Sequence, residues 1–415
     1  MRIAPRLWIG LPGVLLAGAA FCQSLPVASR PDDVGVSAQR LERVRRQMQA
    51  DVESGRIPGA VLLIARKGKI AAFDAIGFQE RKSQTPMKKE SIFRIASMTK
   101  PVVSTAAMIL AEEGKLDIGA PVAQYLPEFK DVRVGVDKAA PKRPPTVQDL
   151  LRHTSGLTYG IFGNSAVDEL YKKSTIFASN SLADMVATIA SLPLAHQPGE
   201  FWEYSVSTDV LGRIVEVVSG MELDRFVAAR ITGPLKMTDT GFYLNASQAT
   251  RLAHPDSAAT VPAGDPTKKP AVLSGGGGLF STAGDYARFC QTMLNGGELG
   301  GVRILAPKTV ALMTSDQLPP GTERHTSVAT LLDAFGPTPE MGTSFGLGFA
   351  VRTDAGRNPV PGSVGDFSWG GIYGTIFWVD PAEKLVAVLM LQAPRPVLVP
   401  YWRQTRMLVY QALVN

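Results

Sequence analysis

Two pairs of apolar runs, one near each end of the chain, most constrain how it can fold. Residues 60–65 and 70–77 are joined by the polar turn Arg-Lys-Gly-Lys, and residues 375–379 and 385–391 flank a turn at Asp380-Pro381. Short apolar runs separated by a polar turn predict β-hairpins. The segment between the hairpins, especially residues 150–235, has helical patterning instead. The chain therefore predicts an α/β fold of the α+β type, in which one antiparallel sheet is built from both ends and flanked by helices, with an inserted mainly helical region.

Local signals divide the chain further. Ser37 is a good N-cap for a helix that ends before Gly55, and a second helix is expected from about Ser97 to Glu113, closed by Gly114. A last helix is expected from about Trp402. We expect residues 36–114 and 236–415 to form the sheet-containing α/β domain and residues 115–235 to form the helical region.

Composition excludes several classes of protein. Of the 415 residues, 45% are hydrophobic and 19% are charged, which allows a large core and excludes a disordered chain. The formal net charge of +6 comes from basic residues scattered along the chain. A nucleic-acid-binding protein would show a basic stripe or a known module, so we expect no nucleic-acid partner.

The N-terminus indicates export. Arg2 and Arg6 precede an apolar run from Leu7 to Phe21, as in a secretory signal peptide that we place at residues 1–22. The run is short for a membrane span, so we expect no stable span after cleavage and a secreted or periplasmic protein. Lipidation of Cys22 stays open. Cys290 would then be the single remaining cysteine, which implies no disulfide framework.

Ser97 and Lys100 form a Ser-x-x-Lys motif at the start of the second predicted helix. Residues three apart lie on one helix face, so the hydroxyl and the amine can approach each other. A serine needs a base to become a strong nucleophile, and a lysine can be that base where burial or nearby cations favour its neutral form. The first helical turn also offers unpaired N–H groups to a developing negative charge. The motif indicates a serine nucleophile, although this spacing occurs about once by chance in a chain of this length.

Five segments, in order, resemble the serine β-lactamase and penicillin-binding-protein superfamily. They are residues 93–100 (FRIASMTK), 150–157 (LLRHTSGL, as in the class C-like branch), 203–206 (EYSV), 274–285 with four consecutive glycines, and 369–371 (WGG). The resemblance runs from about residue 36 to the C-terminus and implies a β-lactamase-like fold. It also implies that Ser97 is the nucleophile and that Lys100 and Tyr204 share proton transfer. Backbone N–H groups of Ser97 and Ile372 would then form the oxyanion hole.

Two departures from the superfamily pattern narrow the implied function. Val206 stands where the Tyr-x-Asn element has its asparagine, and Trp369-Gly370-Gly371 stands where Lys-Thr-Gly is usual. Both departures resemble the family VIII carboxylesterases. Trp369 removes a positive charge, Gly370 removes a hydroxyl donor and Val206 removes an amide, whereas Gly371 would let the substrate approach the backbone. A substrate-binding site built from these four residues favours a neutral ester over a charged lactam or peptide.

Other motifs in the chain are weaker. Gly342–Gly346 matches the Gly-x-Ser-x-Gly pentapeptide around Ser344, but that motif needs a following helix and a later histidine, and no histidine follows His325. The four histidines are far apart in sequence, so we expect neither a metal site nor a cofactor.

The sequence thus predicts a serine carboxylesterase that hydrolyses neutral, short-chain esters through an acyl-enzyme on Ser97. The short chain is implied by the resemblance alone. The alternatives are a class C-like β-lactamase or a D-amino-acid peptidase, an acyltransferase that uses the same acyl-enzyme, and a cell-wall-binding protein that has lost turnover. The expected partner is a small-molecule ester, with β-lactams as possible substrates, and the oligomeric state stays open.

Overall fold

The computed structural model describes residues 25–255, 264–324, 332, 335–393 and 395–414. The predicted signal peptide, residues 1–22, lies outside this part of the chain. Within it, no helix combines the length and apolar character needed to cross a membrane.

An eight-stranded sheet joins the two ends of the chain, as predicted. Its strand order is β10-β11-β12-β13-β14-β1-β2-β3, and every pair in it is antiparallel. The strands are β1 (Gly59–Arg66), β2 (Lys69–Glu80), β3 (Thr85–Pro86), β10 (Thr343–Phe345), β11 (Ala350–Arg352), β12 (Phe367–Gly370), β13 (Ile376–Asp380) and β14 (Leu385–Leu391). Both predicted hairpins are confirmed, and β1 pairs with β14 from Ala60 opposite Leu391 to Arg66 opposite Leu385.

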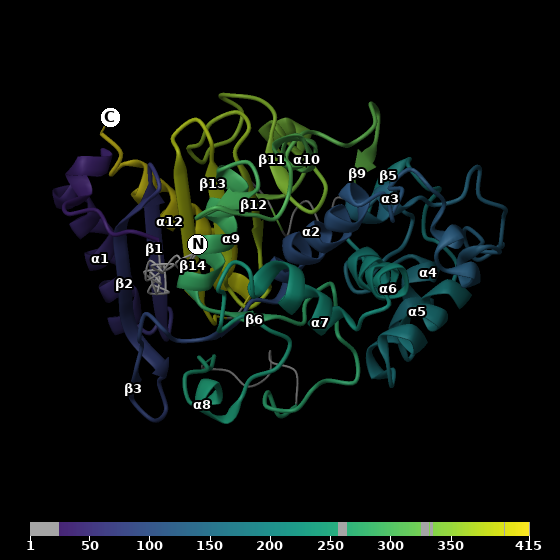
Figure 1. The fold of residues 1–415 in the computed structure, drawn as a ribbon, viewed down its shortest axis with the longest axis horizontal. Coiled ribbons are helices and arrows are strands. Elements are labelled where there is room, and N and C mark those ends of the chain that lie inside the picture. The colour runs from purple at the N-terminus through teal and green to yellow at the C-terminus, as the bar shows by residue number, and fades with distance from the viewer. Residues whose placement is uncertain (1–24, 256–263, 325–331, 333–334, 394, 415) are drawn as a thin grey trace, which may run out of the picture.

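Helices cover both faces of this sheet. Successive side chains of a strand point to opposite faces, so Leu62 and Ile64 pack with helices α1 (Ala38–Glu53) and α12 (Arg395–Tyr410). The intervening Val61 and Leu63 belong to a second apolar cluster that includes helices α2 (Thr99–Glu112) and α9 (Ala283–Leu294). Figure 1 shows α1 and α12 on one side of the strands, and α9 with α2 on the other. Helix α2, which follows Ser97, is therefore buried along most of its length.

The helical region extends beyond the far end of α2 (Figure 1). Between residues 115 and 235 the helices are α3 (Val147–Leu151), α4 (Ala166–Lys173), α5 (Leu182–Ser191), α6 (Ser207–Ser219) and α7 (Leu223–Val227), with the two-residue strand β5 (Phe201–Trp202). Helices α8 (Ala246–Ala249) and α10 (Pro307–Met313), and short strands β7 (Glu298–Leu299), β8 (Val302–Arg303) and β9 (Glu323–Arg324), follow later in the chain. The predicted fold class, an antiparallel sheet flanked by helices with a helical insertion, is confirmed.

One helix boundary was predicted wrongly. Helix α12 begins at Arg395, seven residues before the predicted start at Trp402, and contains Pro400. Proline in a helix interior removes a hydrogen bond, so local preference disfavours a helix that runs through Pro400. Leu398 and Tyr401 are buried in the cluster beneath the sheet, and this packing outweighs the local preference.

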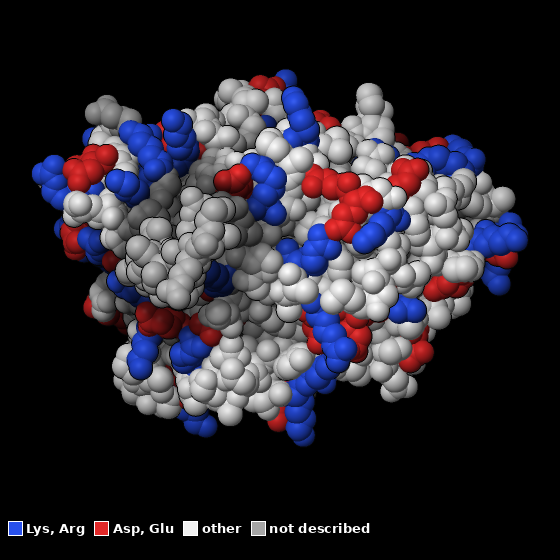
Figure 2. All heavy atoms as spheres, viewed as in Figure 1, with Lys and Arg blue, Asp and Glu red and all other residues white. Residues whose placement is uncertain are grey.

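The distribution of charge on the surface agrees with the scattering of basic residues along the sequence. On the face shown in Figure 2, Lys and Arg are interspersed with Asp and Glu, and no continuous basic stripe is visible.

Candidate active site

Ser97 lies at the junction of a strand and a buried helix. Strand β4 (Phe93–Arg94) leads into a 3₁₀ turn (Ala96–Met98), which continues directly into α2, close to the predicted helix start. Strand β4 pairs with β6 (Phe280–Ser281), and the N–H of Ile95 donates to the carbonyl of Leu279 at 3.1 Å. Ala96 has φ 43°, a left-handed conformation that costs a non-glycine residue about 1 kcal/mol or more. The fold thus holds the backbone immediately before Ser97 in a strained conformation.

Lys100 is buried beside Ser97 and has three polar neighbours. Its Nζ lies 3.3 Å from Ser97 Oγ, 3.0 Å from Tyr159 Oη and 2.7 Å from the carbonyl oxygen of Gly276. The side chain is 1% exposed. The serine and lysine that the sequence singled out are therefore in contact, and two further groups complete the surroundings of the amine.

The glycine-rich segment 275–278 brings the backbone against Lys100. A side chain at Gly276 would put its Cβ 2.5 Å from Asp209 Oδ2 and 2.9 Å from Tyr159 Oη, so only glycine fits there. Asp209, buried on α6, accepts hydrogen bonds from Ser274 Oγ (2.6 Å) and from the N–H of Gly276 (3.0 Å). Burial raises the pKa of the Asp209 carboxyl, although these hydrogen bonds and Lys100 oppose the shift. Asp209 thus holds the segment whose carbonyl contacts the amine.

Tyr204 is close to Lys100 but contacts it through its ring. The Lys100 Nζ lies 4.5 Å from the centroid of the Tyr204 ring, a cation–π arrangement. The Tyr204 hydroxyl is buried and has no hydrogen-bond partner among the described residues. Its ring packs in an aromatic cluster that includes His153, Tyr159, Phe162, Trp202 and Trp369. The predicted tyrosine therefore lies at the site, whereas the hydroxyl that contacts the amine belongs to Tyr159.

Tyr159 was missed by the sequence analysis. It follows the LLRHTSGL segment by two residues, so a longer reading of that segment would have included it. Burial raises the pKa of its phenol well above the ordinary value of 10, and nearby Asp209 and Tyr204 add to the shift. The Tyr159 hydroxyl therefore stays protonated at neutral pH.

The predicted oxyanion-hole residues lie at the end of β12 and the start of α2. Ile372 follows Gly371 in a tight turn, in which the N–H of Gly374 donates to the carbonyl of Gly371 at 2.8 Å. A Cβ at Gly371 would lie 2.3 Å from the carbonyl oxygen of Ile95, and Thr375 Oγ1 donates to that same oxygen at 3.3 Å. The absence of a side chain at Gly371 thus lets the β12 turn pack against the segment that precedes Ser97. Ser97 and Ile372 both line one cavity.

The remaining predicted binding residues differ in their placement. Trp369 lines the cavity, and its ring is buried against Tyr204 and Phe345 with centroid distances of 5.4 and 5.2 Å. Gly370 also lines the cavity, and Trp402 fills the space beside it. Val206 is buried in the apolar core and does not belong to the cavity lining.

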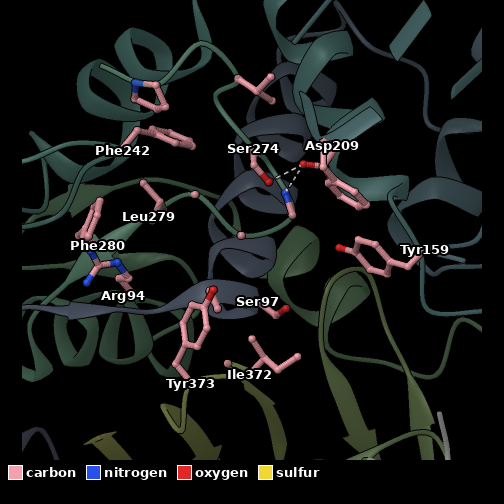
Figure 3. Close-up of a pocket in the computed structure, with 18 of the residues that line it drawn as sticks. Arg94, Ser97, Tyr159, Asp209, Phe242, Ser274, Leu279, Phe280, Ile372 and Tyr373 are labelled. Carbon is pink, nitrogen blue, oxygen red and sulfur yellow. Dashed lines mark hydrogen bonds between the residues drawn. The ribbon is translucent and has the colours of Figure 1, made fainter. Parts of the chain in front are cut away.

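The cavity itself is large and mainly apolar. Its volume is about 1100 Å³, and Ser97 lies on its wall. In Figure 3, Tyr159 lies on one side of Ser97, whereas Arg94, Phe280 and Phe242 lie on the other. Such a concave apolar space with a few polar groups beside a nucleophile is typical of a small-molecule site.

The competing serine lies elsewhere. Ser344 is buried in β10, and its hydroxyl donates to Asp316. It does not line the cavity, and β10 is followed by β11 instead of the helix that the pentapeptide motif requires. Among the described residues, no cluster of three or more His, Cys, Asp or Glu side chains could hold a metal ion.

Comparisons with known proteins show the family and the fold of the chain. Residues 44–411 match the family described as Beta-lactamase. The chain is 36% identical to protein Rv1367c of Mycobacterium tuberculosis, over 82% of this chain and 87% of that protein. It is 32% identical to esterase EstB of Burkholderia gladioli, over 86% of this chain and 91% of that protein. Among solved structures, EstCE1, a hydrolase with promiscuous acyltransferase activity, superposes with a TM-score of 0.75 at 29% identity, over 89% of this chain and 98% of that one.

Proposed function

The chain belongs to the beta-lactamase family and is a serine hydrolase; from that premise we propose that it is a secreted or periplasmic carboxylesterase of the family VIII type, with Ser97 as nucleophile. The contact between Ser97 Oγ and Lys100 Nζ at the wall of the apolar cavity carries this proposal. The similarity to esterase EstB supports an ester substrate.

The surroundings of Lys100 hold its amine in position to act as the base for Ser97. A neutral amine has two N–H groups and one lone pair. In the structure Lys100 Nζ donates to the Gly276 carbonyl, to Tyr159 Oη and to Ser97 Oγ. Loss of the N–H that faces Ser97 would leave a lone pair directed at the Ser97 hydroxyl, whereas the other two hydrogen bonds hold the amine in place. As Ser97 Oγ attacks the ester carbonyl carbon, its proton passes to Lys100.

Tyr204 supplies a proton to the leaving group in this scheme. Tyr204 lines the cavity, and its buried hydroxyl has no intramolecular partner among the described residues, so a substrate oxygen that reaches it can accept a hydrogen bond from it. The tetrahedral intermediate expels the alcohol with the Tyr204 proton, and the Lys100 ammonium returns a proton to the phenolate. Water then attacks the acyl-enzyme, and the acid leaves as Ser97 regains its proton.

The oxyanion is stabilised by the backbone N–H groups of Ser97 and Ile372. Ser97 is in the turn that opens α2, where N–H groups and the helix dipole favour negative charge. The contact between Thr375 and the carbonyl of Ile95 ties the two halves of this oxyanion hole together.

The substrate is an ester that carries no charge beside the scissile bond. Trp369 provides an apolar ring where the superfamily pattern has a lysine, and Tyr204 and Phe345 hold that ring in place. An anionic group next to this ring would lose its hydration without an ionic partner. We propose short acyl chains, as the resemblance implies, with the volume of about 1100 Å³ leaving room for a larger alcohol.

Acyl transfer is a second candidate activity. The solved neighbour EstCE1 is described as a hydrolase with promiscuous acyltransferase activity, and an acyl-enzyme can pass its acyl group to an alcohol as well as to water. Adding a primary alcohol to an ester hydrolysis assay and measuring the new ester separates the two reactions.

The decisive measurement compares kcat/KM for p-nitrophenyl butyrate and for a chromogenic cephalosporin. We expect the ester to be preferred by at least 100-fold. Ser97→Ala should reduce ester turnover by 1000-fold or more, whereas Ser344→Ala, outside the cavity, should change it less than about 3-fold. Equal turnover of the cephalosporin would favour the β-lactamase alternative, and loss of activity in Ser344→Ala alone would overturn the assignment of the nucleophile.

A further inference from the structure

Arg94 is a cation at the active-site cavity whose charge the described protein does not neutralise. It lies in β4, three residues before Ser97, and pairs with Phe280 of β6. Because side chains alternate along a strand, Phe93 enters the core and Arg94 faces the cavity. Its guanidinium carbon lies 5.4 Å from the centroid of the Phe280 ring.

The guanidinium has hydrogen-bonding capacity that is not used. Arg94 Nη1 is buried and has no hydrogen-bond partner among the described residues. Two buried arginines elsewhere differ: Arg352 and Arg406 both contact the carboxylate of Asp366, at 2.7 and 2.6 Å. Leaving a charged donor buried without a partner costs free energy, which a bound anion would offset.

The charges around Arg94 also indicate that its guanidinium lacks a carboxylate partner within the described protein. Burial lowers the pKa of Arg94, and no carboxylate of the described chain opposes this shift. Among the described residues, the two acidic side chains that line the cavity are engaged elsewhere, Asp209 with Ser274 and Gly276, and Asp265 with Thr267. The cation is therefore held against an aromatic ring without a counter-charge from these carboxylates.

The position of Arg94 limits how far an anion can lie from the scissile bond. Three residues of extended chain span at most about 10 Å, so the α-carbons of Arg94 and Ser97 are no farther apart than that. In Figure 3 the Arg94 side chain lies with Phe280 on the side of Ser97 away from Tyr159. Because Arg94 and Ser97 also line the same cavity, a substrate that extends along this cavity can contact both groups.

We propose that Arg94 forms an anion subsite of the cavity, and that the preferred substrates are esters with a carboxylate several bonds from the scissile carbonyl. This inference rests on the proposed esterase function and refines it: the ester is uncharged beside Trp369 and charged at the Arg94 end. Guanidinium groups bind carboxylates through paired hydrogen bonds, and the neighbouring Phe280, Phe242 and Leu279 lower the local dielectric constant.

The test compares esters matched in length. On the acyl side, the p-nitrophenyl monoester of glutaric acid is compared with p-nitrophenyl pentanoate. On the alcohol side, 4-acetoxybenzoate is compared with 4-methylphenyl acetate. Each pair is measured with the wild type, Arg94→Met and Arg94→Lys, and with Arg46→Met as a control. Arg46 is exposed on α1, on the other face of the sheet, so its loss changes net charge only.

We expect Arg94→Met to reduce the kcat/KM ratio of carboxylate to neutral ester by 10- to 100-fold in one of the two pairs, mainly through KM, as for loss of a charge-assisted hydrogen bond. Arg94→Lys should keep part of the preference, and Arg46→Met should keep all of it. The pair that responds shows which side of the ester carries the carboxylate. An unchanged ratio in both pairs would overturn the proposal.

A binding measurement separates this inference from the esterase proposal. In the Ser97→Ala background, monomethyl glutarate should bind at least 10-fold more weakly when Arg94→Met is added, as measured by calorimetry. If the wild type hydrolyses no ester but this difference is found, the esterase proposal fails and the anion subsite stands. If the wild type hydrolyses esters and the difference is absent, the subsite fails alone.

Discussion

The polar groups on the two walls of the cavity, on either side of Ser97, differ in how many hydrogen-bond partners they have within the protein. On the tyrosine wall, formed by Tyr159, Tyr204 and Asp209 with Lys100 behind them, the Lys100 amine contacts oxygen atoms from three separate segments. On the arginine wall, formed by Arg94, Phe242, Phe280 and Tyr373, the guanidinium rests on an aromatic ring and Nη1 has no hydrogen-bond partner within the described structure.

This difference separates side chains that hydrogen bonds within the protein fix in place from side chains whose hydrogen-bonding groups are free to bind a ligand. Hydrogen bonds within the protein fix the orientation of a side chain, which suits a base that must meet Ser97 in one geometry. A buried polar group without a partner gains most when a ligand supplies one. The Tyr204 hydroxyl is the exception on the tyrosine wall, because it has no hydrogen-bond partner among the described residues. By the same reasoning, we expect it to donate a hydrogen bond to the substrate.

The largest expected effect on kcat comes from removing one hydroxyl of the tyrosine wall at a time. Tyr204→Phe should lower kcat by 100-fold or more, because it removes the proposed proton donor to the leaving alcohol. Tyr159→Phe should lower kcat by about 10-fold and shift the pH profile of kcat/KM, because it removes a hydrogen-bond partner of Lys100. Steady-state kinetics from pH 6 to 10 measure both effects. If Tyr159→Phe is the more damaging change, Tyr159 is the proton donor and Tyr204 supports the amine.

An intermediate effect is expected when a cation replaces Trp369, whose ring packs against Tyr204 of the tyrosine wall. Trp369→Lys should raise the kcat/KM ratio of carboxylate to neutral esters by several-fold, because it restores positive charge near the position of the superfamily lysine. Trp369 is 2% exposed, so Trp369→Phe serves as the control for lost packing, and circular dichroism checks that both variants fold. An identical ratio in the two variants would limit Trp369 to a packing role.

The smallest effect concerns stability and pH. Glu203, next to Tyr204, is buried, and its Oε2 has no hydrogen-bond partner in the described part of the chain, although His196 Nε2 lies 3.8 Å from it. Burial raises its pKa to about 8, with nearby Asp168 as a second cause. Between about pH 5 and 8 the folded chain keeps a proton that the unfolded chain releases, so the free energy of unfolding falls as pH rises through this range. Glu203→Gln should reduce that fall.

Urea unfolding at pH 5 and pH 8 measures this difference. We expect the wild type to lose on the order of 1 kcal/mol or more relative to Glu203→Gln over this range. A parallel pH dependence in the two proteins would show that Glu203 is ionised in the folded state.

The hairpins and the Ser97–Lys100 pair could be predicted because their signals are local. Short apolar runs on either side of a polar turn determine β1, β2, β13 and β14, and a spacing of three on one helix face brings Ser97 to Lys100. The start of α12 was predicted wrongly because local proline rules do not include packing of Leu398 on the sheet.

The meeting of Tyr159, Asp209 and Arg94 at one cavity could not be predicted in this way, although a longer reading of the LLRHTSGL segment would have included Tyr159. Tyr159 precedes α4, Asp209 lies in α6 and Arg94 lies in β4, and nothing in the spacing of these residues shows that they share one cavity with Ser97. Val206 was given a binding role that its position does not support. Its place in a recognised segment suggested that it binds substrate, whereas the fold buries it in the core.

The sequence by itself determined the two hairpins near the ends of the chain, the helical character of the region between them and the contact between Ser97 and Lys100, since each depends on side-chain patterning within a few residues. Only the tertiary structure decided which tyrosine hydroxyl meets the amine and which charged side chain is left without a partner among the described residues. Those outcomes depend on the convergence of distant segments and on the exclusion of water, neither of which is encoded in local spacing.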